Sequence, residues 1–208
     1  MPAGKDHAAL GFRVHSGWAA MVVVAGPPRS PSVIERHRIE LIKPGIPRQP
    51  YHAAEGMELK AAEKLIKRCT DTARLLAREA VAAAVRDLRK KGYEVVGSGL
   101  LLASGRPLPG LAATLASHAL IHTAEGELFR DALLHASQHY RLPVARVKER
   151  EIFAQGAAQL GLRVENLPAR LNDLGRSLGP PWRQDEKLAA LVAWLAVAGP
   201  PQRHGRTR

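Results

Sequence analysis

Short apolar runs at the start of the chain form the first recognisable pattern. Residues 8–15 (AALGFRVH) and 18–26 (WAAMVVVAG) read as two strands, and the Ser-Gly pair between them supplies a glycine that can adopt the positive φ of a tight hairpin. Residues 32–41 (SVIERHRIEL) alternate apolar and polar positions, which is typical of a strand with one solvent-facing side. The pattern therefore predicts three antiparallel strands, followed by a crossing loop over the proline-rich residues 43–52.

The apolar spacing then changes to three and four residues. Between Glu58 and Lys91 this spacing indicates one long helix, about 50 Å long at 1.5 Å per residue, and Gly92 follows as its C-terminal cap. Residues 93–104 (YEVVGSGLLLAS) are densely apolar, as in a central strand that is covered on both faces. A long helix and a buried strand are therefore predicted after the loop.

Helix and strand patterns continue to alternate beyond this point. Residues 111–140 predict a helix in two pieces, with a bend near Thr123 or Gly126. Residues 142–149 (LPVARVKE) predict a fifth, short strand, and residues 151–160 predict the helix that packs beside it.

A last helix is predicted at residues 184–199, after a loop-rich stretch through Pro168. We expect a single domain over residues 8–198, because a chain of 208 residues with 46% hydrophobic content is long enough for one core and short for two. Residues 1–7 and the basic end at 199–208 are expected to be disordered.

This order of elements predicts an α/β fold with a five-stranded mixed sheet, three antiparallel strands first and then helix–strand crossovers, and helices on both faces. Over nearly the whole chain the arrangement resembles the ribonuclease H-like superfamily, which includes ribonuclease H, Holliday-junction resolvases, transposases and predicted bacterial nucleases. Two stretches sharpen the resemblance to the resolvase-like branches. GFRVHSGWAAMVVV keeps Gly11 and the Ser16-Gly17 turn, and WRQDEKLAALVAWLA places Asp185 where the last helix of those enzymes begins with an acidic residue.

The sequence departs from these nucleases at the metal site that the resemblance implies. Their first-strand carboxylate aligns with Arg13, and the predicted fourth strand has no acidic residue after Glu94. Two-metal phosphodiester hydrolysis needs several carboxylates around Mg²⁺ or Mn²⁺, because hard cations prefer oxygen ligands. The resemblance therefore implies a degenerate metal site without efficient cleavage, in which Asp185 is a remnant acid.

Arg13 and His15 are the candidate phosphate ligands in this interpretation. A guanidinium binds phosphate oxygens directly, so both side chains would hold a nucleic-acid phosphate at the crevice of the sheet. The alternative is that Arg13 extends into solvent from a strand whose outer face is wet.

A competing hypothesis makes the protein an enzyme, a metal-dependent phosphodiesterase or nuclease with relocated ligands. His122, Glu125 and Asp185 would be its catalytic residues, with Glu125 and Asp185 as ligands of Mg or Mn. His122 and Glu125 lie three residues apart on a predicted helix, where they could act as a base and its orienting carboxylate, or form an ordinary ion pair. The sequence leaves open whether the chain has enzymatic activity and whether it has any cofactor.

Two His-x-x-x-His pairs lie on the same predicted helix. His118 with His122, and His135 with His139, each place two imidazoles on one helical face, which is the geometry of a two-histidine metal site. Surface or hydrogen-bonded core histidines give the same spacing, so metal binding stays open here.

The charge of the chain favours an anionic partner. The formal net charge is +12 and the pI is about 10.5, which makes nucleic acid the first candidate, although solvated surface charge is an alternative. Basic residues follow one side of the long helix and could contact phosphates: Lys60, Lys64, Lys67, Arg74 and Arg78. The apolar spacing of this helix also allows a scaffold protein that forms a homodimer through it.

Several classes of protein are excluded or made less plausible by composition. A single cysteine, Cys69, allows no intrachain disulfide and no cysteine-based zinc site, and its place in a helical apolar stripe indicates a core residue. No signal peptide and no apolar stretch of membrane-spanning length occurs, so we expect a cytoplasmic protein without a membrane partner. Walker-type phosphate loops and Gly-x-Ser-x-Gly elbows are missing, and aromatic residues make up 4% of the chain, too few to indicate a base-stacking platform.

Overall fold

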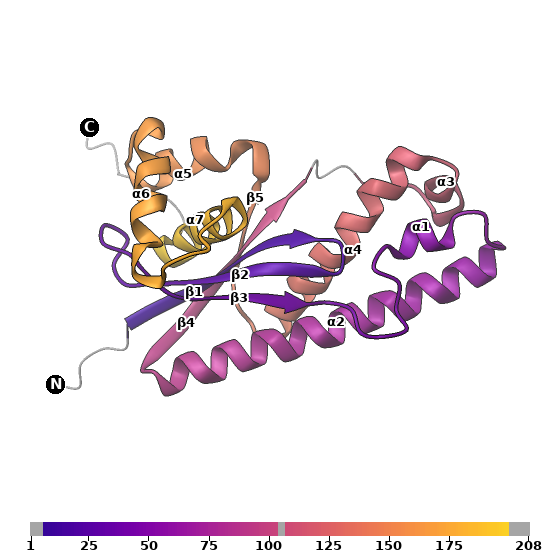
Figure 1. Ribbon diagram of the computed structural model, residues 1–208, viewed down its shortest axis with the longest axis horizontal. Helices are drawn as coiled ribbons and strands as arrows, with labels where there is room; N and C mark the ends of the chain where they lie inside the picture. The colour runs from indigo at the N-terminus through magenta and orange to yellow at the C-terminus, as the bar shows by residue number, and fades with distance from the viewer. Residues whose placement is uncertain (1–5, 104–106, 200–208) are drawn as a thin grey trace, which may run out of the picture.

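Backbone hydrogen bonds join five strands into one mixed sheet in the order β3-β2-β1-β4-β5 (Figure 1). The structure is a computed structural model that describes residues 6–103 and 107–199. β1 pairs antiparallel with β2 and parallel with β4, which confirms the predicted α/β fold. The strands are β1 (Asp6–His15), β2 (Trp18–Ala25), β3 (Ser32–Glu40), β4 (Tyr93–Leu102) and β5 (Val144–Lys148).

Helices cover both faces of this sheet. α2 and α4 pack on one face, and α7 packs on the other with α5 and α6 beside it (Figure 1). No helix in the described part of the chain is long and apolar enough to cross a membrane. The helices are α1 (Pro50–Ala54), α2 (Leu59–Lys90), α3 (Leu111–Leu115), α4 (His118–His139), α5 (Ile152–Leu160), α6 (Leu167–Leu174) and α7 (Gln184–Ala198).

α7 packs directly on the backbone of the two central strands. A Cβ atom at Gly11 of β1 would lie 1.9 Å from the carbonyl oxygen of Ala189, and one at Gly99 of β4 would lie 2.3 Å from that of Val192. Only glycine leaves room for so close an approach. This contact holds the first turn of α7 beside Arg13, two residues beyond Gly11.

The opposite face of the sheet carries the other half of the core. Leu10 and Phe12 of β1 are buried in the same core as the apolar stripe of α2, in which Ala73 and Ala77 are fully buried. Because the chain's own sheet and α4 cover this stripe, its interpretation as a dimer seam is wrong. Cys69 also lies in the stripe, and burial raises the pKa of its thiol, as expected for a core residue.

Three local predictions are wrong. α1 begins at Pro50, inside the predicted crossing loop, because proline fits the first turn of a helix. Pro168 stands in the first turn of α6 for the same reason. α4 runs without a break past Thr123 and Gly126, and the two helical pieces of this segment separate at residues 116–117 instead.

The predicted disorder of the chain ends is partly corrected. β1 begins at Asp6, so Asp6 and His7 belong to the sheet and not to a disordered terminus. Gly199 is also ordered, because it caps α7 and its carbonyl accepts a hydrogen bond from Gln159. The rest of that prediction, for residues 1–5 and 200–208, lies outside the described residues.

Candidate functional site

One face of β1 turns polar beyond the cover of α7. Side chains alternate between the two faces of a strand, so Arg13 and His15 point to the same side as Gly11, the side on which α7 lies. Asp185 is in the first turn of α7, and Glu149 directly follows β5. The parallel strands β1, β4 and β5 all end at this edge, where open α/β sheets gather ligands.

Arg13 holds the two acidic residues together. Its Nη1 donates to Oδ1 of Asp185, and its Nη2 donates to Oε1 of Glu149 over 2.8 Å. Nε2 of His15 lies 3.1 Å from the same oxygen of Asp185. These four residues, Arg13, His15, Glu149 and Asp185, form what we call the Arg13 cluster.

The charge and burial of the Arg13 cluster set what it can bind. Burial by itself would lower the pKa of the Arg13 guanidinium, but the hydrogen bonds and charges of Glu149 and Asp185 outweigh that effect and hold this pKa above its ordinary value. The Arg13 side chain is 21% exposed, Asp185 26% and Glu149 45%, so Glu149 is the partner most open to exchange with solvent. The cluster places one guanidinium between two carboxylates.

An aromatic side chain extends this polar surface across the hairpin. The His15 ring stacks on Trp18 of β2 with centroids 4.3 Å apart and planes within 9°. The guanidinium carbon of Arg38 on β3 lies 3.8 Å from the centroid of the Trp18 ring, and Arg38 also pairs with Glu40. Trp18 and Arg38 were not among the predicted site residues, although the register of β1, β2 and β3 places them beside His15.

The structure does not bring His122, Glu125 and Asp185 together. Glu125 is buried and bonds to His52 of α1, His122 contacts His118, and Asp185 belongs to the Arg13 cluster. Within the described part of the chain, no group of three metal-ligating side chains includes Asp185. The hypothesis that these three residues hold one cation is therefore wrong, as is the pairing of His122 with Glu125.

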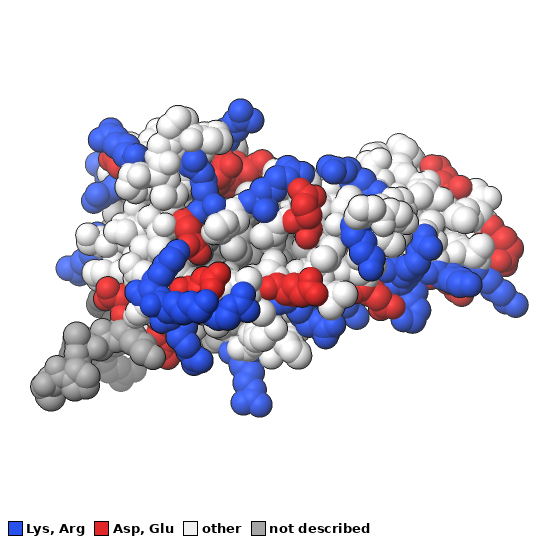
Figure 2. All heavy atoms as spheres, turned by 60° about the horizontal axis from the view of Figure 1, so that its bottom comes forward, with Lys and Arg blue, Asp and Glu red and all other residues white. Residues whose placement is uncertain are grey.

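The basic stripe on α2 is only partly free. Lys67 pairs with Asp71, and Arg74 pairs with Asp131 of α4, both at 2.6 Å. Figure 2 shows Lys and Arg side chains along this side of the molecule, with acidic side chains between them. Ion pairs within the described residues are not found for the other members of the stripe: Lys60, Lys64 and Arg78.

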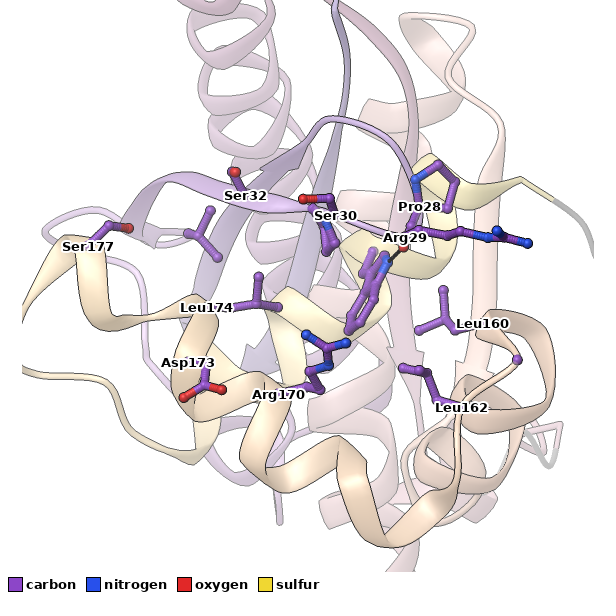
Figure 3. Close-up of a pocket in the computed structure, with 14 residues that line it drawn as sticks. Pro28, Arg29, Ser30, Ser32, Leu160, Leu162, Arg170, Asp173, Leu174 and Ser177 are labelled. Carbon is purple, nitrogen blue, oxygen red and sulfur yellow. Dashed lines mark hydrogen bonds between the residues drawn. The ribbon is translucent and has the colours of Figure 1, made fainter.

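A pocket of about 650 Å³ lies at the other end of the sheet, between the β2–β3 turn and α6. Pro28 and Ser30 line one side of it, and Arg170 and Asp173 of α6 line another (Figure 3). Trp194 also lines the pocket, and its Nε1 donates to the Pro28 carbonyl over 2.8 Å. None of the predicted site residues lines this pocket, because the antiparallel pairing of β1 and β2 puts it at the opposite end of β1 from Arg13.

Sequence reasoning missed Glu149 and His52. The resemblance directed attention to an acid on the fourth strand, whereas Glu149 comes from the end of the fifth. An acidic residue at the end of the predicted fifth strand, residues 142–149, was the available signal. His52 fell in a predicted loop, so nothing indicated that it faces α4.

Comparisons of the fold identify structural neighbours at low sequence identity. RuvC from T. thermophilus in complex with a Holliday junction substrate aligns with a TM-score of 0.53 and 11% identity, over 90% of this chain and 90% of RuvC. A second Thermus thermophilus RuvC structure aligns with a TM-score of 0.50 and 10% identity, over 90% of this chain and 91% of RuvC. No protein-family model matches the sequence, and no curated protein matches it. The neighbours confirm the predicted ribonuclease H-like fold.

Proposed function

We propose that this chain binds nucleic acid on a ribonuclease H-like scaffold and does not cleave it efficiently with metal ions at the Arg13 cluster. One observation carries the proposal. Arg13 is bonded to Asp185 and Glu149 at the end of the first strand, where the nucleases that the chain resembles have a carboxylate.

Mg²⁺ and Mn²⁺ do not fit the Arg13 cluster as it stands. Hard divalent cations need several carboxylate oxygens, and both carboxylates here are hydrogen-bonded to a guanidinium. A divalent ion in contact with both would lie beside a second positive charge, which repels it. A metal can bind there only if Arg13 leaves or is replaced.

A phosphate fits the same place better than a metal does. Glu149 is the more exposed partner of Arg13, so an incoming phosphate displaces it more easily than it displaces Asp185. Nη2 of Arg13 then donates to phosphate oxygens while Nη1 keeps its bond to Asp185. Asp185 orients the guanidinium, and His15 lies within reach as a second donor.

The whole molecule supports a polyanionic partner. The net charge of +12 favours phosphate backbones, with an affinity that falls as salt rises. One structural neighbour, RuvC, is bound to a Holliday junction substrate, which makes branched DNA a substrate to test first.

The test is fluorescence anisotropy with labelled four-way junction, duplex and single-stranded DNA and RNA. We expect binding that weakens with salt, does not require Mg²⁺ or Mn²⁺, and leaves the strands intact. Absence of binding to every probe at moderate salt would contradict nucleic-acid binding, and strand cleavage that needs Mn²⁺ would contradict the loss of the metal site.

Arg13→Ala tests the role of the cluster. Loss of the guanidinium should weaken binding of the preferred probe by roughly threefold to tenfold at fixed salt, because a phosphate contact is lost. Arg163→Ala is the matched control, since Arg163 is 84% exposed and lies away from the sheet edge, in the turn after α5. Equal affinities of the two variants for this probe would show that Arg13 does not contribute to the binding surface.

A further inference from the structure

Three histidines meet where α1 packs on the first turns of α4. His118 and His122 lie one turn apart on α4, and His52 faces them from α1. The centroid of the His52 ring is 4.7 Å from that of His122 and 5.5 Å from that of His118. Figure 1 places α1 and the start of α4 at the end of the molecule away from α5 and α6. This histidine cluster (His52, His118 and His122) is separate from the Arg13 cluster.

The ring nitrogens of the histidine cluster have the spacing of a metal site. One ring nitrogen from each residue lies within 4.8 Å of the other two, and the Nε2 atoms of His118 and His122 are 3.1 Å apart. Bonds of 2.0–2.1 Å from Zn²⁺ to nitrogen in a tetrahedral site separate neighbouring ligand nitrogens by about 3.4 Å. The Nε2 atoms of His118 and His122 are therefore already near the separation of two ligands on one Zn²⁺ ion. A movement of His52 toward them would bring its ring nitrogen to the same separation.

A buried carboxylate holds His52 in the orientation that a ligand needs. Oε1 of Glu125 lies 3.1 Å from Nδ1 of His52, and it accepts the backbone N–H groups of Tyr51 at 2.8 Å and His52 at 3.0 Å. With Nδ1 donating to the carboxylate, Nε2 of His52 keeps its lone pair. A histidine that ligates a metal characteristically donates its other nitrogen to a carboxylate in this way.

One carboxylate oxygen of Glu125 is buried without a hydrogen-bond partner in the described part of the chain. Its side chain is 3% exposed, and its Oε2 is buried without a hydrogen-bond partner among the described residues. A buried carboxylate with an unpaired oxygen is costly unless positive charge lies close by, which a cation bound to His52 provides.

We propose that His52, His118 and His122 bind one divalent transition-metal cation of the Zn²⁺ type, with Glu125 as the positioning residue for His52. Three imidazoles favour Zn²⁺, Ni²⁺ or Cu²⁺ over Mg²⁺, which prefers oxygen ligands. His118 and His122 are exposed, so a remaining coordination position faces solvent and takes water or an anionic oxygen. The bound ion also links α1 to α4, and the proposal does not depend on nucleic-acid binding.

The test uses the full chain without an added histidine tag, after treatment with a chelator. Zn²⁺ titration by calorimetry should give one site per chain, and Co²⁺ should give visible absorption bands of a four- or five-coordinate site. Zn²⁺ should also raise the Tm, because the ion binds the folded chain only. Failure of the wild-type chain to bind Zn²⁺ at micromolar concentrations would overturn the proposal.

Variants on α4 distinguish Zn²⁺ binding at the histidine cluster from Zn²⁺ binding at any exposed histidine. His118→Ala and His122→Ala should each lower Zn²⁺ affinity by at least about 100-fold, since a three-ligand site loses a ligand. His139→Ala is the matched control, because His139 is exposed at the end of the same helix and also has a histidine four residues before it. Equal loss of Zn²⁺ affinity in His139→Ala, or none in His118→Ala, would contradict the assignment.

Glu125→Gln tests the positioning role. The amide oxygen can still accept the backbone N–H groups, but the negative charge is lost, so Zn²⁺ affinity should fall by about 10- to 100-fold. The Co²⁺ spectrum of this variant should keep its three-histidine character, because the ligands themselves are unchanged. Wild-type Zn²⁺ affinity in a folded Glu125→Gln chain, with folding checked by circular dichroism, would exclude this role of Glu125.

DNA binding by His118→Ala tests whether the metal proposal is independent of the proposed function. Unchanged DNA affinity in this variant would show that the two proposals fail or hold separately.

Discussion

At the scale of single residues, Arg13 decides the chemistry of the sheet edge. It lies between the carboxylates of Asp185 and Glu149 and has a pKa held above its ordinary value, so it keeps its charge at any physiological pH. The carboxylates therefore serve to orient a cationic side chain. They become available to a metal ion only when that side chain is replaced.

Arg13→Asp tests this directly. The substitution removes the guanidinium and puts a third carboxylate beside Asp185 and Glu149, so Mn²⁺ should bind at least about tenfold more tightly than in the wild-type chain. Mn²⁺ affinity is measured by electron paramagnetic resonance or calorimetry. His118→Ala in the same background is the control, because it removes the histidine cluster as the source of the signal. Equal Mn²⁺ affinity in the wild-type chain and in the Arg13→Asp variant would contradict the account of the Arg13 cluster.

At the scale of elements, α7 is the part that assembles the candidate site. Its backbone lies against Gly11 and Gly99, and this contact sets Asp185 beside Arg13. The two glycines on neighbouring strands let the helix approach the sheet closely, and so they set both its distance from the sheet and its position along the strands.

Gly11→Ala should lower the free energy of unfolding by about 1–3 kcal/mol or more, because the added Cβ overlaps the Ala189 carbonyl oxygen and pushes α7 off the sheet. Urea unfolding measures this change. Gly110→Ala is the control, since a Cβ at Gly110 would meet no atom within 4 Å. A Gly11→Ala chain as stable as the control would contradict the close packing of α7.

The sequence predicted the strands, α2 and α7 well. β3 and α2 have a clear apolar period, and the other strands and α7 contain dense apolar runs that differ from the loops around them. It failed for α1 and α6, because a proline favours a loop but also fits the first turn of a helix, where both prolines stand. The candidate site was half predicted. Arg13, His15 and Asp185 do meet, but their partner Glu149 comes from a strand whose place in the sheet no local pattern gives.

At the scale of the whole molecule, positive charge is spread over the surface and partly neutralised in pairs. Lys67 and Arg74 of the α2 stripe have acidic partners, which leaves Lys60, Lys64 and Arg78 as its better candidates for phosphate contacts. In the Arg13 cluster, the guanidinium of Arg13 is already paired with two carboxylates. Attraction of a polyanion must therefore come mainly from the wider surface, with Arg13 adding a local contact.

The triple variant Lys60→Ala, Lys64→Ala, Arg78→Ala tests the stripe. The slope of log affinity against log salt should become shallower by about 0.9 for each duplex phosphate contact that is lost. The slope is measured by anisotropy over a series of salt concentrations. An unchanged slope and affinity would mean that the stripe is only solvated surface.

The most direct test of the central claim combines binding and integrity of the same molecules. Labelled four-way junction is titrated with the wild-type chain at several salt concentrations with Mn²⁺ present, and each endpoint is run on a denaturing gel. The account predicts saturable binding that weakens with salt and leaves full-length strands. Product bands that appear only with Mn²⁺, or no binding at moderate salt, would contradict it.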